Sequence, residues 1–198
     1  MLDWLRSWTF WLLLSTGFTG GMTFLYVIRW IGWWLFPPPV LHVHFSPKGG
    51  CTERVVSEIH KARREILVLA YSFTSKAISE ALIAAHKRGV TVDIVLDHSN
   101  EKEDHTDLGL IAEAGLSPAI DAHHAIAHNK VMVIDRRTVL TGSFNFTNQA
   151  EHENAENLLV LRHHHELVAA YRQNFELHRG HARQPEKLAV TTGRRHAA

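Results

Sequence analysis

The stretch EILVLAYSFTSKAISEALIAAHKRGVTVDIVLD, residues 65–97, decides the fold class. It opens with Glu65–Phe73, a mostly apolar run that is typical of a buried strand. Residues 75–88 then place apolar side chains at helical spacing, and Gly89 follows as a helix C-cap. A second apolar run of strand length, Val90–Asp97, comes next. Strand, helix and strand in this order predict an α/β fold with helices covering a largely buried sheet.

The same alternation continues on both sides of this stretch. Upstream, residues 51–64 have the helical spacing of apolar side chains. Downstream, a polar loop is expected at 98–107 and a short helix at 108–114. Further strands and a closing helix are predicted at residues 130–135, 138–142, 157–162 and 166–178. We find no internal repeat.

The first 36 residues have a different character, and all six tryptophans of the chain lie within them. The run from Ser7 to Ile28 is 22 residues long and uncharged. At a rise of about 1.5 Å per residue, a helix of this length crosses a hydrocarbon core of roughly 30 Å. The tryptophans cluster at the two ends of the run, as they do at membrane interfaces. These features predict a transmembrane anchor over residues 7–36, ended by three prolines at 37–39.

A cleaved signal peptide and a buried amphipathic helix are the alternatives to an anchor. A signal peptide has a basic start, an apolar core of about 7–15 residues and an Ala-x-Ala cleavage site. Here Asp3 accompanies Arg6, the apolar run is longer, and no Ala-x-Ala follows. One arginine flanks each end of the run, so the orientation stays open. The chain then divides into an anchor or uncleaved signal segment at 1–39, a folded domain at 40–179 and a basic tail at 180–198 that we predict to be disordered.

Composition excludes several classes of protein. A formal net charge of +1, with 45% hydrophobic and 21% charged residues, argues against a disordered chain and against a polycation that holds nucleic acid by bulk charge. An anionic substrate must therefore be bound by a local site. The single cysteine excludes an internal disulfide and a Cys-rich zinc module, although it leaves the compartment open.

The segment HNKVMVIDRRTVLTGSFNFTNQAEHENAE, residues 128–156, carries the chemistry. Polar residues recur in it at fixed offsets inside apolar strands, as H-x-K-x4-D followed by G-S-x-N: His128, Lys130, Asp135, Gly142, Ser143 and Asn145. Strand alternation places His128 and Lys130 on one face. Such a pair suits a phosphate, because lysine supplies positive charge while a neutral imidazole can act as nucleophile or exchange protons near pH 7. Ser143 and Asn145, also two residues apart, would add neutral donors to the phosphate oxygens.

These motifs resemble those of the phospholipase D superfamily, in the branch that has one H-x-K-x4-D motif per chain. The similarity runs from residue 45 to 179 and includes FSP at 45–47, AYSFT at 70–74, KRGV at 87–90 and TGSFNFT at 141–147. Within the superfamily the bacterial endonuclease branch is most similar, and the mitochondrial cardiolipin hydrolases are related to it. The resemblance implies an α-β-α sandwich with a mixed sheet, and hydrolysis of phosphodiesters without a metal or another cofactor.

The resemblance also implies roles for individual residues. The matching positions are the nucleophile His128, the phosphate ligands Lys130 and Asn145, the nearby hydroxyl Ser143, and Glu156 as the carboxylate that orients a catalytic histidine. Asp135 and Gly142 are motif positions too. We expect a structural, charge-balancing role for Asp135, because it falls at the end of a predicted strand.

The number of motifs has a consequence for assembly. Two-step phosphodiester cleavage needs one histidine as nucleophile and a second to protonate the leaving oxygen and later activate water. This chain has one such motif. The sequence therefore predicts a homodimer whose twofold axis passes through one shared active site. Two copies of Lys130 would balance the extra negative charge of the transition state.

The other histidines, from a total of 16, invite a metal interpretation. His123 and His124, just upstream of the motif, are candidates for lining the active-site cleft, with a surface loop as the alternative. We interpret the run at 163–165 as a solvated turn. A functional metal site needs three or four converging ligands, ideally with acidic partners behind them. A zinc site that joins Cys51 to His42 and His44 is disfavoured. We therefore expect no metal in the protein.

The choice of substrate is left open by this reasoning, because the chemistry recognises only the phosphodiester. A nuclease acting on DNA or RNA is the first hypothesis, a phospholipase or cardiolipin hydrolase the second, and an inactive membrane-anchored scaffold the third. We expect the anchor to hold the domain at a bacterial inner membrane, facing the periplasm. Release into the periplasm after cleavage, or attachment to a mitochondrial outer membrane, are the alternatives.

Overall fold

The computed structural model describes residues 7–35, 37–101 and 107–185, and it divides into two compact units between Pro38 and Pro39. The described part of the first unit is a single long helix, α1 (Trp8–Leu35), in which no residue is buried. By length and composition α1 is able to cross a membrane. This helix coincides with the anchor predicted from the sequence.

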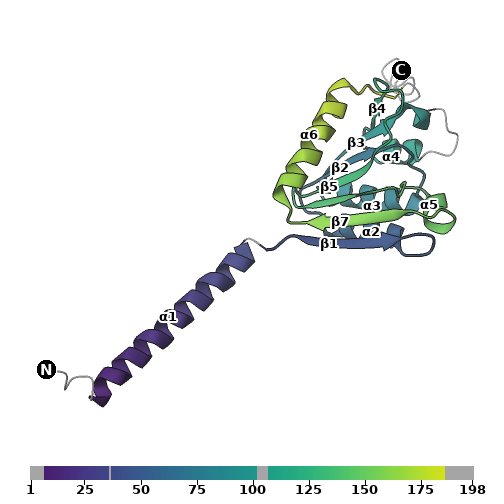
Figure 1. Cartoon of the computed structure of the whole chain (residues 1–198). Coiled ribbons are helices and arrows are strands. Elements are labelled where there is room, and N and C mark those ends of the chain that lie inside the picture. Colours follow the sequence, from purple (N-terminus) through teal and green to yellow (C-terminus); the bar gives the residue numbers. More distant parts are fainter. Residues whose placement is uncertain (1–6, 36, 102–106, 186–198) are drawn as a thin grey trace. The chain divides into compact units, whose positions relative to one another are not determined.

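The second unit is built on one seven-stranded mixed sheet (Figure 1). Its strands lie in the order β1-β7-β6-β5-β2-β3-β4. β2, β3 and β4 are parallel to one another, whereas β1, β7, β6, β5 and β2 are antiparallel neighbours. The strands are β1 (Val40–Phe45), β2 (Glu65–Ala70), β3 (Thr91–Asp97), β4 (Ala119–Asp121), β5 (Lys130–Ile134), β6 (Thr138–Gly142) and β7 (Asn157–Arg162).

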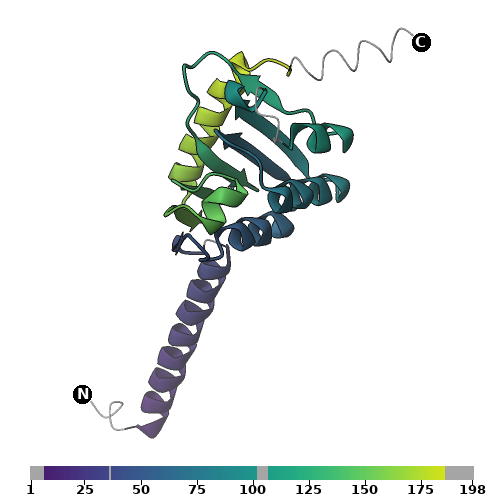
Figure 2. The ribbon, with the colours of Figure 1, turned by 90° about the vertical axis from the view of Figure 1, so that its right-hand side faces the viewer.

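Helices cover both faces of the sheet. α2 (Cys51–Lys61) and α3 (Lys76–Lys87) lie on one face, and α6 (His165–His181) lies on the other (Figure 2). Each face has its own cluster of buried apolar side chains, one shared with α2 and α3 and one shared with α6. Three shorter helices are η2 (His98–Glu101), α4 (Leu108–Glu113) and α5 (Asn148–His152). The predicted α-β-α sandwich with a mixed sheet is confirmed.

Sequence periodicity located most of these elements, with differences at their ends. β2 stops at Ala70, three residues before the predicted end, because the chain leaves the sheet at Tyr71. β1, β4 and α5 were not predicted. β4 has only three residues and depends on pairing with β3, so no local pattern marks it.

The tail predicted to be disordered from residue 180 is ordered at its start. α6 continues to His181, and Arg183 then pairs with Ile120 through two backbone hydrogen bonds of 2.7 and 2.9 Å. These bonds hold a segment that is poor in apolar residues, which is why composition alone was misleading. Residues 186–198 of the predicted tail lie outside the described residues.

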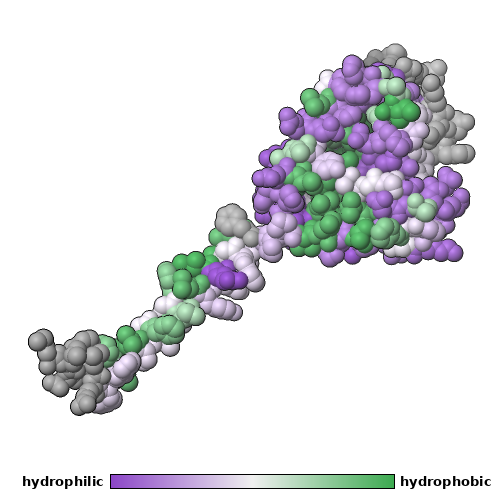
Figure 3. Space-filling view, viewed as in Figure 1, coloured by the Kyte–Doolittle hydropathy of each residue, from purple (hydrophilic) through white to green (hydrophobic). Residues whose placement is uncertain are grey.

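One edge of the sheet is apolar and exposed. Leu41, Val43 and Phe45 alternate along β1 and are all exposed. Leu41 pairs with Leu161 and Val43 with Leu159, so these side chains share a face of the sheet. They form part of the hydrophobic surface beside β1 and β7 (Figure 3). α6 covers the sheet from β4 to β6 and leaves this strip uncovered.

Candidate active site

The candidate catalytic residues gather at the ends of three neighbouring strands. β5 begins at Lys130, β6 ends at Gly142 and β7 begins at Asn157. Because β6 is antiparallel to both β5 and β7, the start of β5, the end of β6 and the start of β7 lie side by side at the same end of the strands. The fold thus brings together residues that are separated by up to 28 positions in the sequence.

His128 and Lys130 are held together by Tyr71. The imidazole of His128 contacts the Tyr71 ring with 4.6 Å between centroids, and the Nζ of Lys130 lies 5.0 Å from the centroid of the same ring. The Lys130 Nζ also donates to the carbonyl of His128 at 3.3 Å. His128 lies in the loop before β5 and not in the strand as predicted, because β5 begins only at Lys130. The sequence analysis missed Tyr71, although AYSFT places it directly after a buried strand.

The two side chains differ in exposure. The imidazole of His128 is exposed, as its predicted role requires, whereas Lys130 is only 7% exposed. Burial lowers the pKa of the Lys130 ammonium below its usual value, and the negative charge of Glu156 opposes this shift. A partly desolvated ammonium interacts more strongly with an anion than one in bulk water does.

Ser143 and Asn145 follow β6 in an extended segment. Phe144 and Phe146 are buried in the core, so the alternating Ser143 and Asn145 face away from it. The Oγ of Ser143 accepts hydrogen bonds from the backbone N–H of Asn157 at 3.0 Å and from its Nδ2 at 3.2 Å. The Oδ1 of Asn145 is buried and has no partner among the described residues. An unpaired buried polar atom costs free energy, so this one is suited to pairing with a substrate or a second subunit.

Gly142 is required by this arrangement. Its φ of +145° is rare for residues with a side chain, and an added Cβ would lie 2.3 Å from the carbonyl oxygen of Asn157. The close approach of β6 to the start of β7 therefore depends on glycine. It sets the position of Ser143 against Asn157.

Glu156 lies beside this group without a hydrogen bond to His128. Its Oε1 accepts from the Nδ2 of Asn154 at 3.2 Å, and its backbone pairs with Ser46 in both directions. Within the described part of the chain its carboxylate makes no hydrogen bond to His128. The interaction that connects it to the site is electrostatic, with the ammonium of Lys130.

A buried carboxylate fixes the loop that leads to His128. Asp97, 1% exposed, accepts the backbone N–H of Ala127 on Oδ2 at 2.7 Å and that of Ser99 on Oδ1 at 2.9 Å. Burial alone would raise the pKa of the Asp97 carboxyl, but the hydrogen bonds from Ser99 and Ala127 hold it below its usual value. Asn100 adds a 2.6 Å bond from its Nδ2 to the Tyr71 carbonyl. Sequence reasoning missed these supports, since their partners lie about 30 residues away.

Asp135 lies at the other end of β5 from Lys130. Its carboxylate accepts the backbone N–H groups of Arg63, Arg64 and Glu65 at 2.9, 2.7 and 3.1 Å. It therefore ties the turn after β5 to the start of β2 and does not face the group around His128.

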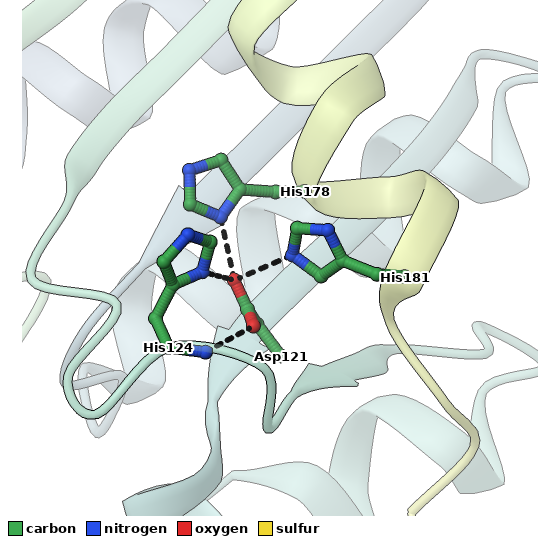
Figure 4. Close-up of side chains that lie close together, drawn as sticks. All are labelled: Asp121, His124, His178 and His181. Carbon is green, nitrogen blue, oxygen red and sulfur yellow. Dashed lines mark hydrogen bonds and ion pairs between the residues drawn. The ribbon is translucent and has the colours of Figure 1, made fainter.

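The other histidine predictions have different outcomes. His124 contacts Asp121, His178 and His181, which lie outside the group around His128 (Figure 4). His123 contacts His124 and His181, and its backbone N–H donates to Asp121. Cys51 is fully buried, and the Nε2 of His44 accepts from the Nε of Arg54 at 3.1 Å. No cluster of metal ligands joins Cys51 to a histidine among the described residues.

A hollow of about 730 Å³ lies beside the first turns of α2 and α3. Its lining includes Lys48, Lys76 and His152 together with Glu53 and Glu151. None of the five candidate catalytic residues lines it, so volume alone does not identify the reactive site. The chemistry of the residues beside Tyr71 is the stronger criterion.

Comparison with known proteins gives a consistent result. Residues 55–179 match the family described as cardiolipin synthase, phospholipase D-like domain. The phospholipase D of Rickettsia prowazekii is 43% identical over 131 residues, which are 66% of this chain and 63% of the relative. The mitochondrial cardiolipin hydrolase of Chlamydomonas reinhardtii is 30% identical over 135 residues, which are 68% of this chain and 60% of the relative. The chain thus matches a little under two thirds of the length of these relatives.

Two solved structures share the fold. Nuc from Salmonella typhimurium, described as a phospholipase D family member, superposes with a TM-score of 0.71 at 36% identity, over 74% of this chain and 98% of Nuc. NucT from Helicobacter pylori superposes with a TM-score of 0.68 at 21% identity, over 74% of this chain and 99% of NucT. The second likeness concerns the fold alone.

Proposed function

The chain belongs to the phospholipase D-like family, and we propose that it is a metal-independent phosphodiesterase, specifically an endonuclease that cleaves DNA or RNA. The observation that carries this proposal is the contact of one tyrosine ring with both an exposed imidazole and a buried ammonium, those of His128 and Lys130. A nucleophile and a fixed positive charge held 5 Å or less from the same ring centroid are the two groups that attack on a phosphodiester requires.

In the first step, a ring nitrogen of His128 attacks the phosphorus atom. The new N–P bond forms as the bond from phosphorus to the leaving oxygen breaks. A second imidazole, from His128 of another copy of the chain, gives its proton to that oxygen. The products of this step are a free alcohol and a phosphohistidine.

In the second step, water replaces the histidine. The imidazole that lost its proton now removes one from a water molecule, whose oxygen attacks the phosphorus. The N–P bond breaks, a phosphomonoester leaves, and both histidines return to their starting states. No electron transfer and no metal enters this sequence.

The polar neighbours stabilise the charge that develops on the phosphate oxygens. Lys130 supplies a partly desolvated positive charge. The Oγ of Ser143 already accepts two hydrogen bonds from Asn157, which leaves its own hydrogen available for donation to a phosphate oxygen. The amide of Asn145 is the third group assigned to the phosphate.

We assign the active site to a homodimer with a twofold axis through it. One chain supplies one His128, while the two steps need two imidazoles. The Glu156 carboxylate, which has no bond to His128 within its own chain, would orient the imidazole of the second copy. The buried Oδ1 of Asn145 is a further polar atom that one chain leaves without a partner. These features support a site that a second subunit completes.

We further propose that α1 anchors the enzyme in a bacterial inner membrane, with the catalytic domain in the periplasm. Trp8 and Trp11 near the start of the helix, and Trp30, Trp33 and Trp34 near its end, support an interfacial position for both ends. The bacterial relatives, from Rickettsia and Salmonella, favour a bacterial location.

Hydrolysis of a phospholipid is the second candidate function. Two observations favour it, namely the name phospholipase D given to relatives that are 43% identical and the long apolar helix that could hold the domain at lipid. The nuclease proposal rests on the resemblance of AYSFT and TGSFNFT to the endonuclease branch and on the match to Nuc over 98% of its chain. Both functions use the same chemistry.

The test is hydrolysis by the full-length chain in detergent micelles with excess EDTA. Single-stranded DNA, duplex DNA, RNA and cardiolipin are offered in parallel. His128→Asn removes the nucleophile, and His152→Asn, at an exposed position on α5, is the matched control. We expect cleavage of nucleic acid that His152→Asn retains and His128→Asn loses. Cleavage of cardiolipin alone would establish the second candidate, and no turnover of any substrate by a dimer would contradict both.

The shared site has its own test. After subunit exchange between wild type and a tenfold excess of His128→Asn chains, most wild-type subunits sit in mixed dimers that have one imidazole. We expect the activity per wild-type chain to fall about tenfold, because a mixed dimer lacks the acid or the nucleophile. Activity that stays proportional to the number of wild-type chains would refute the shared site.

A further inference from the structure

A second group of chemically active side chains lies at the C-terminal end of α6 (Figure 4). Asp121 ends β4, His124 follows in the next loop, and His178 and His181 project from the last turn of α6. Each offers one ligand atom, and the four atoms all lie within 4.8 Å of one another. None of these residues belongs to the candidate active site.

We propose that Asp121, His124, His178 and His181 bind one divalent transition-metal ion of the Zn²⁺ class at a structural site. Three imidazole nitrogens and one carboxylate oxygen form a donor set that suits Zn²⁺. With all four positions filled by the protein, a tetrahedral ion has no open position for substrate or water. The site therefore serves to hold the structure together and takes no part in the hydrolysis proposed above.

The four ligand atoms are near enough to one another to converge on one ion. The Oδ2 of Asp121 lies 3.0 Å from Nδ1 of His124, 2.5 Å from Nδ1 of His178 and 3.2 Å from Nε2 of His181. In a tetrahedral zinc site with bonds of about 2.0–2.1 Å, neighbouring ligand atoms are about 3.3 Å apart. Shifts of about 1 Å or less in these side chains would bring all four atoms to that spacing.

The carboxylate is already oriented for this role. Its Oδ1 accepts the backbone N–H groups of His123 at 3.0 Å and His124 at 3.4 Å, which leaves Oδ2 directed at the three imidazoles. Such outer contacts fix a metal-binding carboxylate in place. Asp121 is fully buried, and a buried carboxylate needs compensating positive charge.

A hydrogen-bonded cluster without metal is the competing explanation. It requires three imidazole N–H groups to donate to a single carboxylate oxygen, which has two lone pairs. It also packs the rings closely, with 4.8 Å between the centroids of His124 and His178 and 4.7 Å between those of His123 and His181. One dication bound by Oδ2 and the three ring nitrogens would remove the need for three donors on one oxygen.

The site would connect two parts of the chain that are distant in sequence. Asp121 and His178 are 57 residues apart, and the ion would join the end of β4 to the last turn of α6. It would also fix His124 in the loop that continues to His128. We therefore expect metal binding to stabilise the folded domain and the start of the loop that carries the proposed nucleophile.

The experiment uses the full-length chain in detergent, purified without a polyhistidine tag and freed of metal with EDTA. Zn²⁺ is titrated by calorimetry, and Co²⁺ is titrated by the visible absorption that tetrahedral Co²⁺ shows. We expect one ion per chain. At free Zn²⁺ a hundredfold above the dissociation constant, the unfolding equilibrium constant should fall about a hundredfold, seen as a higher melting temperature. Mg²⁺, which prefers oxygen ligands, should cause no such shift.

Three variants test the assignment. His124→Gln and His181→Gln each remove one ligand at a partly exposed side chain, so both are expected to fold without metal. His165→Gln, at the exposed start of α6, is the matched control. We expect Zn²⁺ affinity to fall at least about a hundredfold in the first two variants and to be unchanged in the control.

Two outcomes would overturn the proposal. One is the absence of stoichiometric Zn²⁺ uptake by the wild type. The other is equal uptake by wild type, His124→Gln and His181→Gln when circular dichroism confirms that all are folded. A cluster that stabilises the fold without binding metal would appear as a lower melting temperature in both variants with no response of the wild type to Zn²⁺. Because these readouts do not involve hydrolysis, their failure is distinct from a failure of the proposed activity.

Discussion

Replacing Asp97 with asparagine tests how the loop before His128 is held. Asp97 is buried, and its two oxygens each accept one backbone N–H, from Ala127 at 2.7 Å and from Ser99 at 2.9 Å. Asparagine has nearly the same shape but keeps only one acceptor oxygen. Its NH₂ group must then face one of the two N–H donors.

The size of the effect follows from these contacts. A hydrogen bond to a charged group contributes about 1.5–3 kcal/mol, and an unpaired buried donor costs about 1–3 kcal/mol. Both figures describe the loss of the same bond, so they are not added. We expect Asp97→Asn to lower the free energy of unfolding by about 2–3 kcal/mol. We also expect a loss of activity of tenfold or more, because Ala127 directly precedes His128.

Asp93→Asn is the matched control, since it makes the same chemical change on the same strand. Asp93 is partly exposed and pairs with Arg179 at 3.1 Å, so we expect a loss of no more than about 1 kcal/mol. Urea unfolding of both variants measures the difference. Losses for Asp97→Asn and Asp93→Asn that agree within about 0.5 kcal/mol would refute the reasoning.

The effect of Asp97→Asn should also depend on pH. The pKa of the Asp97 carboxyl is lower in the folded state than its ordinary value of about 3.9. A carboxyl with a lowered folded pKa contributes stability that is fully present above the unfolded pKa and is lost as the pH falls through the folded pKa. The difference between wild type and variant should therefore be constant above about pH 5 and shrink below about pH 4. A difference that grows in acid would contradict this account.

Three further predictions concern the site and the core. Lys130→Met should lower activity at least about a hundredfold, because it removes the positive charge beside His128. It should leave the free energy of unfolding unchanged or about 1 kcal/mol higher, because it replaces a buried ammonium with an apolar side chain. Strong destabilisation in urea would contradict this prediction. Gly142→Ala should lower the free energy of unfolding by about 2–4 kcal/mol, because its Cβ would lie 2.3 Å from the carbonyl oxygen of Asn157. Gly180→Ala is the contrasting variant, because its Cβ would meet nothing within 4 Å, and it should raise the free energy of unfolding by up to about 1 kcal/mol. Burial, with a smaller contribution from the Glu151 charge, raises the pKa of the Cys51 thiol to about 11. About one thiol in a thousand is then ionised at pH 8, so iodoacetamide should label the native protein very slowly and the unfolded protein readily.

The elements that the sequence predicted are those with a local signal. β2 and β3 could be located as apolar runs of strand length, and α3 because its apolar residues repeat with the period of a helix. β4 and α5 have three and five residues, which is too short for a period to show. β1 is an exception, because Leu41–Phe45 alternates apolar and polar residues, a strand signal that the sequence analysis did not use.

The candidate site likewise contains some residues that the sequence could identify and others that it could not. The offsets within residues 128–145 were enough to select His128, Lys130, Ser143 and Asn145, because these lie on one continuous segment, whereas Glu156 was selected through the family resemblance. Tyr71 and Asp97 could not be selected, since their contacts depend on the placement of β2 between β5 and β3. The group around Asp121 was missed for the same reason, although His124 had been singled out with a different role. Contacts between residues on different strands can be identified only when the order of the strands in the sheet is known.

The exposure of the proposed nucleophile, His128, explains why its neighbouring backbone is fixed by hydrogen bonds. The ring of His128 must stay exposed to reach a substrate, so its contact with the Tyr71 ring cannot fix it alone. Its position depends on the backbone on either side, held by Asp97 at Ala127 and by the 2.7 Å bond from the Tyr71 N–H to the Asn129 carbonyl. The proposed metal site would hold the other end of the same loop. EDTA should therefore lower the melting temperature while leaving hydrolysis intact at temperatures where the protein stays folded, since no group in the two chemical steps needs an ion.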